Sequence, residues 1–204
     1  MIYTGNKDLD HIFERDKIRF ILLYGEPGSG KTNLIFKILK ESVSKGYSVA
    51  YVSTEGTVHL NRLFNIIDDK FLDKIFIATP SSLSELLKII IKLFGYDINI
   101  IAIDSINYLY RIEALTSFRA NEMFLSINAL TFLLSENMKR DVIFSAQVRE
   151  SDEGVEPSGI DLIQFYDPYM IRVKKIYEDV REIFLERDKK SFRFKISHDD
   201  IIWI

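Results

Sequence analysis

Residues 22–39, LLYGEPGSGKTNLIFKIL, join an apolar run to a glycine-rich turn and then to an apolar pattern of helical spacing. The turn contains the complete pattern Gly25-x-x-x-x-Gly30-Lys31-Thr32, the signature of a phosphate-binding loop (P-loop). Such a turn points backbone N–H groups at a phosphate, and the positive end of the following helix favours the phosphate charge. Lys31 would then reach the β- and γ-phosphates, while the Thr32 hydroxyl would take a Mg²⁺ coordination position. A purely structural glycine turn is the alternative, and the strand-to-helix setting disfavours it.

The rest of the chain continues the same alternation of apolar runs and helical patterns. Strands are predicted at residues 20–24, 48–53, 74–78, 98–104 and 142–147, with helices at 32–44, 58–67, 82–95 and 119–138. A loop is predicted at 150–158, followed by antiparallel strands at 169–176, 182–187 and 192–197. The pattern predicts an α/β fold, with a mostly parallel central sheet flanked by helices and antiparallel C-terminal strands. No linker interrupts the chain, so residues 1–204 are expected to form a single domain.

Composition narrows the chemistry available to the chain. Its 204 residues are 47% hydrophobic and 28% charged, with a net charge of -3 that is too small to dictate a partner. The absence of cysteine excludes disulfides, thiol catalysis and cysteine-based metal sites, and three scattered histidines argue against a histidine-rich metal site. The N-terminus is charged and the longest apolar runs are far shorter than a bilayer span. A cytoplasmic protein without a membrane partner is expected.

Three polar residues stand at or just beyond the ends of predicted strands. Asp104 ends the run 98–104, at the sheet edge where ligands of parallel sheets bind, and can hold Mg²⁺ there. Glu55 follows the strand 48–53 and is equally compatible with activating a water molecule and with a helix N-terminal acid. Gln147 ends the strand 142–147, where sensing a γ-phosphate competes with the commoner use as a simple strand-end polar residue.

Several segments, in this order, resemble the RecA/RadA family of recombinase ATPases, most of all its short archaeal RadA paralogues of the RadB type. The similar segments are TGNKDLDHIF, YGEPGSGKTN, YVSTEGTVHLNRL, IIAIDSI, YRIEALTSFRANEMFLSINALTFLL, IFSAQV and FRFKISHDDI. The resemblance covers nearly the whole chain. It implies a RecA-like core that uses ATP and Mg²⁺.

The resemblance also implies a role for each matching residue. Glu55 would be the catalytic glutamate and Gln147 the switch glutamine, with Lys31 acting on the phosphates. Thr32 and Asp104 would hold the metal. The residues around the nucleotide would be Gly25, Glu26, Pro27, Gly28, Ser29, Gly30, Lys31, Thr32 and Asn33.

DNA contacts are expected to differ between the two loops that face DNA in this family. The second loop would follow Gln147, where residues 148–161 are acidic: Glu150, Asp152, Glu153, Glu156 and Asp161 face a single cation, Arg149. Phosphate binding needs Lys and Arg, so binding through this loop is expected to be weak. The first loop carries aromatics and cations that suit a single strand, or that pack and solvate in the ordinary way. Its candidate contacts are Arg111, Phe118 and Arg119.

The resemblance implies partners as well. The expected ones are the main RadA-type recombinase and single-stranded DNA, bound weakly by the chain alone. Full-length recombinases begin with a helical DNA-binding domain and a polymerisation motif, and this sequence begins almost at the core, so autonomous filament formation is not expected. In a homo-oligomer, Lys174 and Lys175 are candidates for the cation supplied across a subunit interface to the γ-phosphate.

Two other functions remain open. A KaiC-like regulatory or signalling ATPase also has segments similar to YGEPGSGKT and YVSTE, but that group typically shows two adjacent glutamates where this chain has Glu55 and Gly56. A nucleotide-gated adaptor would bind ATP and the recombinase with little hydrolysis.

Overall fold

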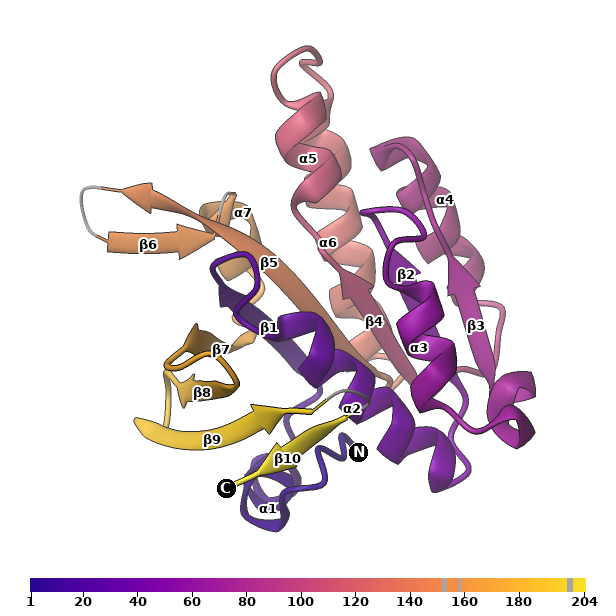
Figure 1. Cartoon of the computed structure of the whole chain (residues 1–204). Coiled ribbons are helices and arrows are strands. Elements are labelled where there is room, and N and C mark those ends of the chain that lie inside the picture. The colour runs from indigo at the N-terminus through magenta and orange to yellow at the C-terminus, as the bar shows by residue number, and fades with distance from the viewer. Residues whose placement is uncertain (152–153, 158, 198–199) are drawn as a thin grey trace.

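The computed structural model describes residues 1–151, 154–157, 159–197 and 200–204, and it is built around one large twisted sheet (Figure 1). The sheet order is β10-β9-β8-β7-β1-β5-β4-β2-β3, with β6 paired to the end of β5. The strands are β1 Phe20–Gly25, β2 Val49–Ser53, β3 Ile75–Ala78, β4 Ile100–Asp104, β5 Asp141–Ser151, β6 Gly154–Pro157, β7 Tyr169–Lys175, β8 Val180–Leu185, β9 Lys190–Ile196 and β10 Ile201–Trp203. Pairing is parallel from β7 through β3 and antiparallel from β7 through β10, which confirms the predicted mixed sheet.

Helices cover both faces of the parallel part of the sheet. They are α1 Lys7–Arg15, α2 Lys31–Ser44, α3 Leu60–Ile66, the 3₁₀ helix η1 Asp69–Lys74, α4 Leu83–Leu93, α5 Tyr108–Glu113, α6 Ala120–Glu136 and α7 Ile160–Gln164. Side chains of β1 alternate between two buried clusters: Ile21 and Leu23 pack with α2, whereas Leu22 and Tyr24 pack with α4 and α6. This alternation follows from the two-residue period of a strand, and it explains why the parallel strands read as continuous apolar runs.

One predicted loop is wrong. Residues 150–158 were expected to be irregular, but β5 continues to Ser151 and pairs antiparallel with β6, from Val148↔Pro157 to Ser151↔Gly154. Backbone pairing in a hairpin does not require apolar side chains. The polar composition of this stretch therefore gave no pattern from which the strands could be predicted. The side chains of residues 149–156 and 158, which include most of the acidic set of the second loop, lie outside the described residues. Asp161 is described, in the first turn of α7.

The segment before β1 is fixed by hydrogen bonds to its own helix. The Asp10 carboxylate accepts from both the backbone N–H and the hydroxyl of Thr4, and Asn6 caps α1 by accepting from the backbone N–H groups of Asp8 and Leu9. The segment that resembles the family's lead-in, TGNKDLDHIF, therefore has a structural explanation. Its threonine and aspartate close a turn, and its leucine enters the core.

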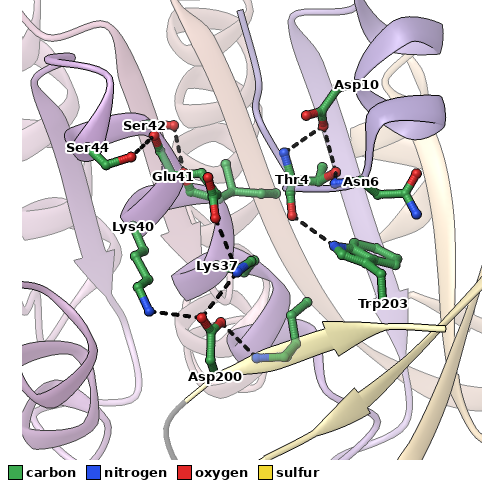
Figure 2. Close-up of polar contacts among 12 residues, drawn as sticks. Thr4, Asn6, Asp10, Lys37, Lys40, Glu41, Ser42, Ser44, Asp200 and Trp203 are labelled. Carbon is green, nitrogen blue, oxygen red and sulfur yellow. Dashed lines mark hydrogen bonds and ion pairs between the residues drawn. The ribbon is translucent and has the colours of Figure 1, made fainter.

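The C-terminal strand is tied to both the N-terminal segment and the helix after the P-loop (Figure 2). The Trp203 indole donates to the Thr4 carbonyl at 2.9 Å, and the Asp200 carboxylate accepts from Lys37 at 3.1 Å and from Lys40 at 2.8 Å. Both lysines lie on α2, so the antiparallel extension is attached to the helix that begins at Lys31. None of the helices in the described part of the chain has the length and apolar character that crossing a bilayer requires.

Candidate active site

The predicted site residues converge because their strands are neighbours and run in the same direction. In the order β1-β5-β4-β2, Gly25 lies opposite Gln147 and Ser53 lies opposite Asp104. The carboxyl ends of parallel strands meet at one edge of a sheet. Residues more than a hundred positions apart in sequence are therefore brought together at this edge.

The glycine-rich turn between β1 and α2 has a backbone that other residues would disrupt. Gly28 and Gly30 have φ angles of +73° and +104°, in the left-handed region that glycine favours. At Gly25 the constraint is distance, since a Cβ atom there would lie 2.1 Å from the carbonyl oxygen of Val173 on β7. An added Cβ on Gly28 would meet nothing within 4 Å, so the space beside this residue is open.

Lys31, the first residue of α2, folds its ammonium group back into the turn. Its Nζ donates to the carbonyl oxygens of Gly25 and Glu26, both at 2.8 Å, and to Ser29 Oγ at 3.3 Å. Burial lowers the pKa of Lys31, and the charges of Asp104 and Glu55 partly oppose that shift. The Lys31 ammonium is thus a buried cation whose hydrogen-bond partners are uncharged. A phosphate bound in the turn would supply the negative charge that these partners lack.

Asp104, at the end of β4, is a buried acceptor for three hydroxyl groups. Its Oδ2 accepts from Thr32 Oγ1 at 2.7 Å and from the Tyr51 hydroxyl at 3.1 Å, while its Oδ1 accepts from Ser145 Oγ. Burial raises the pKa of Tyr51, and the Asp104 charge raises it further, so Tyr51 remains a protonated donor. Adjacent carboxylate and hydroxyl oxygens are the ligands that Mg²⁺ prefers, so Thr32 and Asp104 fit the metal role.

Sequence reasoning missed Tyr51 and Ser145 as partners of Asp104. Each is flanked by apolar residues, Tyr51 by Ala50 and Val52 and Ser145 by Phe144 and Ala146. A buried hydroxyl needs a hydrogen-bond partner, so the polar interruptions were the signal available in the sequence. The register of β4 between β2 and β5 then decides which carboxylate they meet.

Glu55 and Gln147 contact one another beside Asp104. Gln147 Nε2 donates to Glu55 Oε1 at 2.8 Å, and the Ser105 hydroxyl donates to the same oxygen at 3.2 Å. Gln147 Oε1 accepts from a guanidinium nitrogen of Arg111 at 2.8 Å. The prediction that Gln147 ends its strand is wrong, because β5 continues past it to Ser151. Glu55 precedes α3 by several residues and shares a hydrogen-bonded row with Gln147.

The backbone around this row is held by further hydrogen bonds. Thr54 N–H donates to the Asp104 carbonyl at 2.9 Å, and the Thr54 hydroxyl donates to the Ser105 carbonyl at 2.7 Å. The Asn107 side chain pairs with the main chain of Gln147, donating to its carbonyl at 2.8 Å and accepting from its N–H at 3.1 Å. The backbone segments that carry Glu55, Asp104 and Gln147 are therefore linked to one another.

The candidate DNA contacts separate into two groups. Arg111 lies on α5 and reaches Gln147, so the structure brings it to the strand ends. Phe118 and Arg119 lie in the connection from α5 to α6, which projects beyond the strand ends in Figure 1. Phe118 is fully exposed there, and no hydrogen bond of the Arg119 guanidinium occurs among the described residues.

Three further basic side chains border the turn. Lys174 and Lys175 line a hollow together with Gly25, Glu26 and Ser29, which places them beside the P-loop of their own chain. Arg181, on β8, is a buried cation that sequence reasoning missed. A Cβ on Gly30 would lie 3.2 Å from its Cγ, and its Nε has no hydrogen-bond partner among the described residues.

Comparison with known proteins identifies the family to which this chain belongs. A family described as an ATPase domain predominantly from Archaea matches residues 6–151. The DNA repair and recombination protein RadB of Methanococcus maripaludis strain C5 is 30% identical over 187 residues, covering 85% of this chain and 86% of the relative. The proteins of the same name from Methanocaldococcus jannaschii and Methanosphaera stadtmanae are 30% and 29% identical, over 85% and 88% of this chain and 88% and 85% of their own lengths.

The region matched by the family model, residues 6–151, contains the turn, Glu55, Asp104 and Gln147. The chain belongs to the family of ATPase domains found predominantly in Archaea and is a RadB-type member of the RecA/RadA ATPases.

Proposed function

We propose that this chain binds ATP with Mg²⁺ at the edge formed by β1, β5, β4 and β2, and hydrolyses it to ADP and phosphate. The observation that carries the proposal is the convergence of two pairs at this edge. Thr32 and Asp104 lie 2.7 Å apart, and Glu55 and Gln147 lie 2.8 Å apart, beside the turn that encloses the Lys31 ammonium. The first pair suits a metal and the second suits a reacting water.

Each residue has a defined task in the proposed reaction. The backbone N–H groups of residues 25–33 and the Lys31 ammonium bind the phosphates and offset their charge. Glu55 accepts a proton from a water molecule as the water oxygen bonds to the γ-phosphorus, and the bond from that phosphorus to the β–γ bridging oxygen breaks. Gln147 holds the Glu55 carboxylate in place and couples the nucleotide state to the hairpin that follows it. Mg²⁺, held by Thr32 and Asp104, would neutralise charge on the β- and γ-oxygens.

The proposed biological role is to modulate homologous recombination and DNA repair in the cytoplasm, together with the main recombinase and single-stranded DNA. One support is that the relatives are named DNA repair and recombination proteins. Another is the projecting α5–α6 connection, which carries Arg119 and the exposed Phe118. Aromatic and cationic side chains at an exposed tip suit a single strand. Turnover is expected to be slow until DNA or the recombinase is present.

One observation disfavours the signalling alternative. Gly56 has a φ angle of +80°, in the left-handed region where side-chain-bearing residues are strained. A second glutamate beside Glu55, which is typical of the KaiC-like group, would therefore be strained in this turn. The adaptor alternative differs from the proposal only in the rate of hydrolysis, so the assay must decide it.

The experiment measures phosphate release with and without single-stranded DNA and the host's main recombinase. Lys31→Ala defines the background. We expect hydrolysis above this background that DNA or the recombinase stimulates. Nucleotide binding and recombinase binding without hydrolysis above background would establish the adaptor instead. Hydrolysis that is indifferent to both DNA and recombinase would favour the signalling function.

A further inference from the structure

We propose that Arg111 is a positioning residue for hydrolysis: its guanidinium fixes the orientation of the Gln147 amide and, through it, the Glu55 carboxylate. This inference deepens the proposed function and rests on it. The three side chains form a continuous row, with Arg111 2.8 Å from Gln147 Oε1 and Gln147 Nε2 2.8 Å from Glu55 Oε1. Arg111 would therefore act on the reaction without touching the substrate.

The chemistry of the row allows only one orientation of the amide. A guanidinium has only donors and an ionised carboxylate has only acceptors, so the oxygen of Gln147 must face Arg111 and its NH₂ must face Glu55. Without Arg111, rotation of the amide by half a turn would cost less. The rotated amide would place its oxygen against the Glu55 carboxylate, which is repulsive. The guanidinium thus removes a competing state of the residue that holds the catalytic glutamate.

Arg111 can perform this task because its helix is anchored. Asn107 and Arg111 lie one helical turn apart, so they share a face of the helix, and Asn107 pairs with the Gln147 backbone on that face. Tyr110 stacks on Phe124 of α6 with ring centroids 4.3 Å apart. The Glu113 carboxylate accepts from the backbone N–H of Leu83 at the start of α4, at 2.6 Å.

The inference changes the role expected for Arg111 from its sequence. Its place in the segment that resembles the first DNA-facing loop predicts a contact with DNA, yet its guanidinium is hydrogen-bonded to Gln147 at the proposed ATP site. Arg119 provides a matched control, because it belongs to the same predicted DNA-facing loop and is exposed like Arg111, but does not reach Gln147. Removing either charge should weaken an electrostatic DNA contact, whereas only Arg111 should alter the Gln147 amide.

The test combines a measurement that does not depend on hydrolysis with one that does. Nuclear magnetic resonance follows the side-chain NH₂ signals of Gln147 in the nucleotide-free protein, assigned by their loss in Gln147→Leu. Arg111→Ala should shift these signals and speed their exchange with water, while Arg119→Ala should leave them in place. In parallel, Arg111→Ala should lower kcat about tenfold, as expected for loss of one charge-assisted hydrogen bond at the site, with ATP affinity within about twofold of wild type.

Conservative replacement separates positioning from general damage. Arg111→Lys keeps one donor for Gln147 Oε1, so kcat should recover to within about threefold of wild type. Unchanged Gln147 signals in Arg111→Ala, or a rise in KM with unchanged kcat, would overturn the inference. If the wild-type protein hydrolyses no ATP, the proposed function fails, but the Gln147 signals still decide whether Arg111 orients the amide.

Discussion

Gly25, the last residue of β1, lies against the backbone of β7, and Gly25→Ala tests how strictly this close approach is required. A methyl group there would lie 2.1 Å from the Val173 carbonyl oxygen, far inside the ordinary contact distance. The obstacle is backbone rather than a flexible side chain, and β1 and β7 are already paired up to Tyr24↔Arg172. One strand end must therefore move by more than about 1 Å.

The expected cost is at the upper end for overpacking, about 3 kcal/mol of unfolding free energy. For a chain of this length, that corresponds to a fall in Tm of about 6–12 °C. Nucleotide affinity should fall as well, because the Gly25 carbonyl is one of the acceptors that hold Lys31. Urea denaturation, calorimetry and binding of a fluorescent ATP analogue measure the three effects.

Gly28→Ala is the matched control in the same turn. Its φ angle of +73° is left-handed, but an added Cβ meets nothing within 4 Å, so it should incur only backbone strain of about 1–2 kcal/mol. The reasoning about close approach would be refuted if Gly25→Ala were as stable as wild type, or if it were no more destabilised than Gly28→Ala.

Two further substitutions test the hydrogen bonds around the site. Tyr51→Phe removes a buried donor to Asp104 and should lower the free energy of unfolding by about 1.5 kcal/mol; a wild-type urea midpoint would show that this bond adds no stability. Burial raises the pKa of Asp200, but hydrogen bonds from Lys40, the Ile201 backbone N–H and Lys37 outweigh this effect and hold the pKa below its ordinary value of 3.8. Asp200→Asn should therefore cost about 1 kcal/mol at neutral pH, and the gap to wild type should close as the pH falls below 3.8 through the lowered pKa. Asp179→Asn, at an exposed ion pair, should cost under about 0.5 kcal/mol; an equal loss in both variants, or a gap that does not change with pH, would contradict this account.

Much of the site could be predicted because its location follows from the direction of the strands. Once the runs ending at Asp104 and Gln147 are assigned to parallel strands, their carboxyl ends must lie at one edge with the glycine turn. The side-chain contacts within that edge could not be predicted in the same way. Tyr51 meets Asp104 only because β2 and β4 are neighbours in a particular register, which a linear pattern does not specify.

The contact between Arg111 and Gln147 illustrates a second limit. The sequence shows an arginine near two tyrosines, which predicts a nucleic-acid contact. It could not predict the contact with Gln147, because composition does not show the direction of the short helix α5. Its direction depends on the stacking of Tyr110 on Phe124 and on the bond from Glu113 to α4. The β5–β6 hairpin was missed for a related reason, since backbone pairing leaves little trace in polar residues.

The central claim is that the turn binds ATP while Glu55 drives its hydrolysis, and single-turnover hydrolysis measured beside ATP affinity tests it most directly. In Glu55→Gln the shape of the side chain is kept and the proton acceptor is lost. The account predicts ATP affinity within about twofold of wild type and a hydrolysis rate lower by about 10² or more, as for loss of a general base. Hydrolysis at the wild-type rate in Glu55→Gln, with Lys31→Ala inactive, would contradict it.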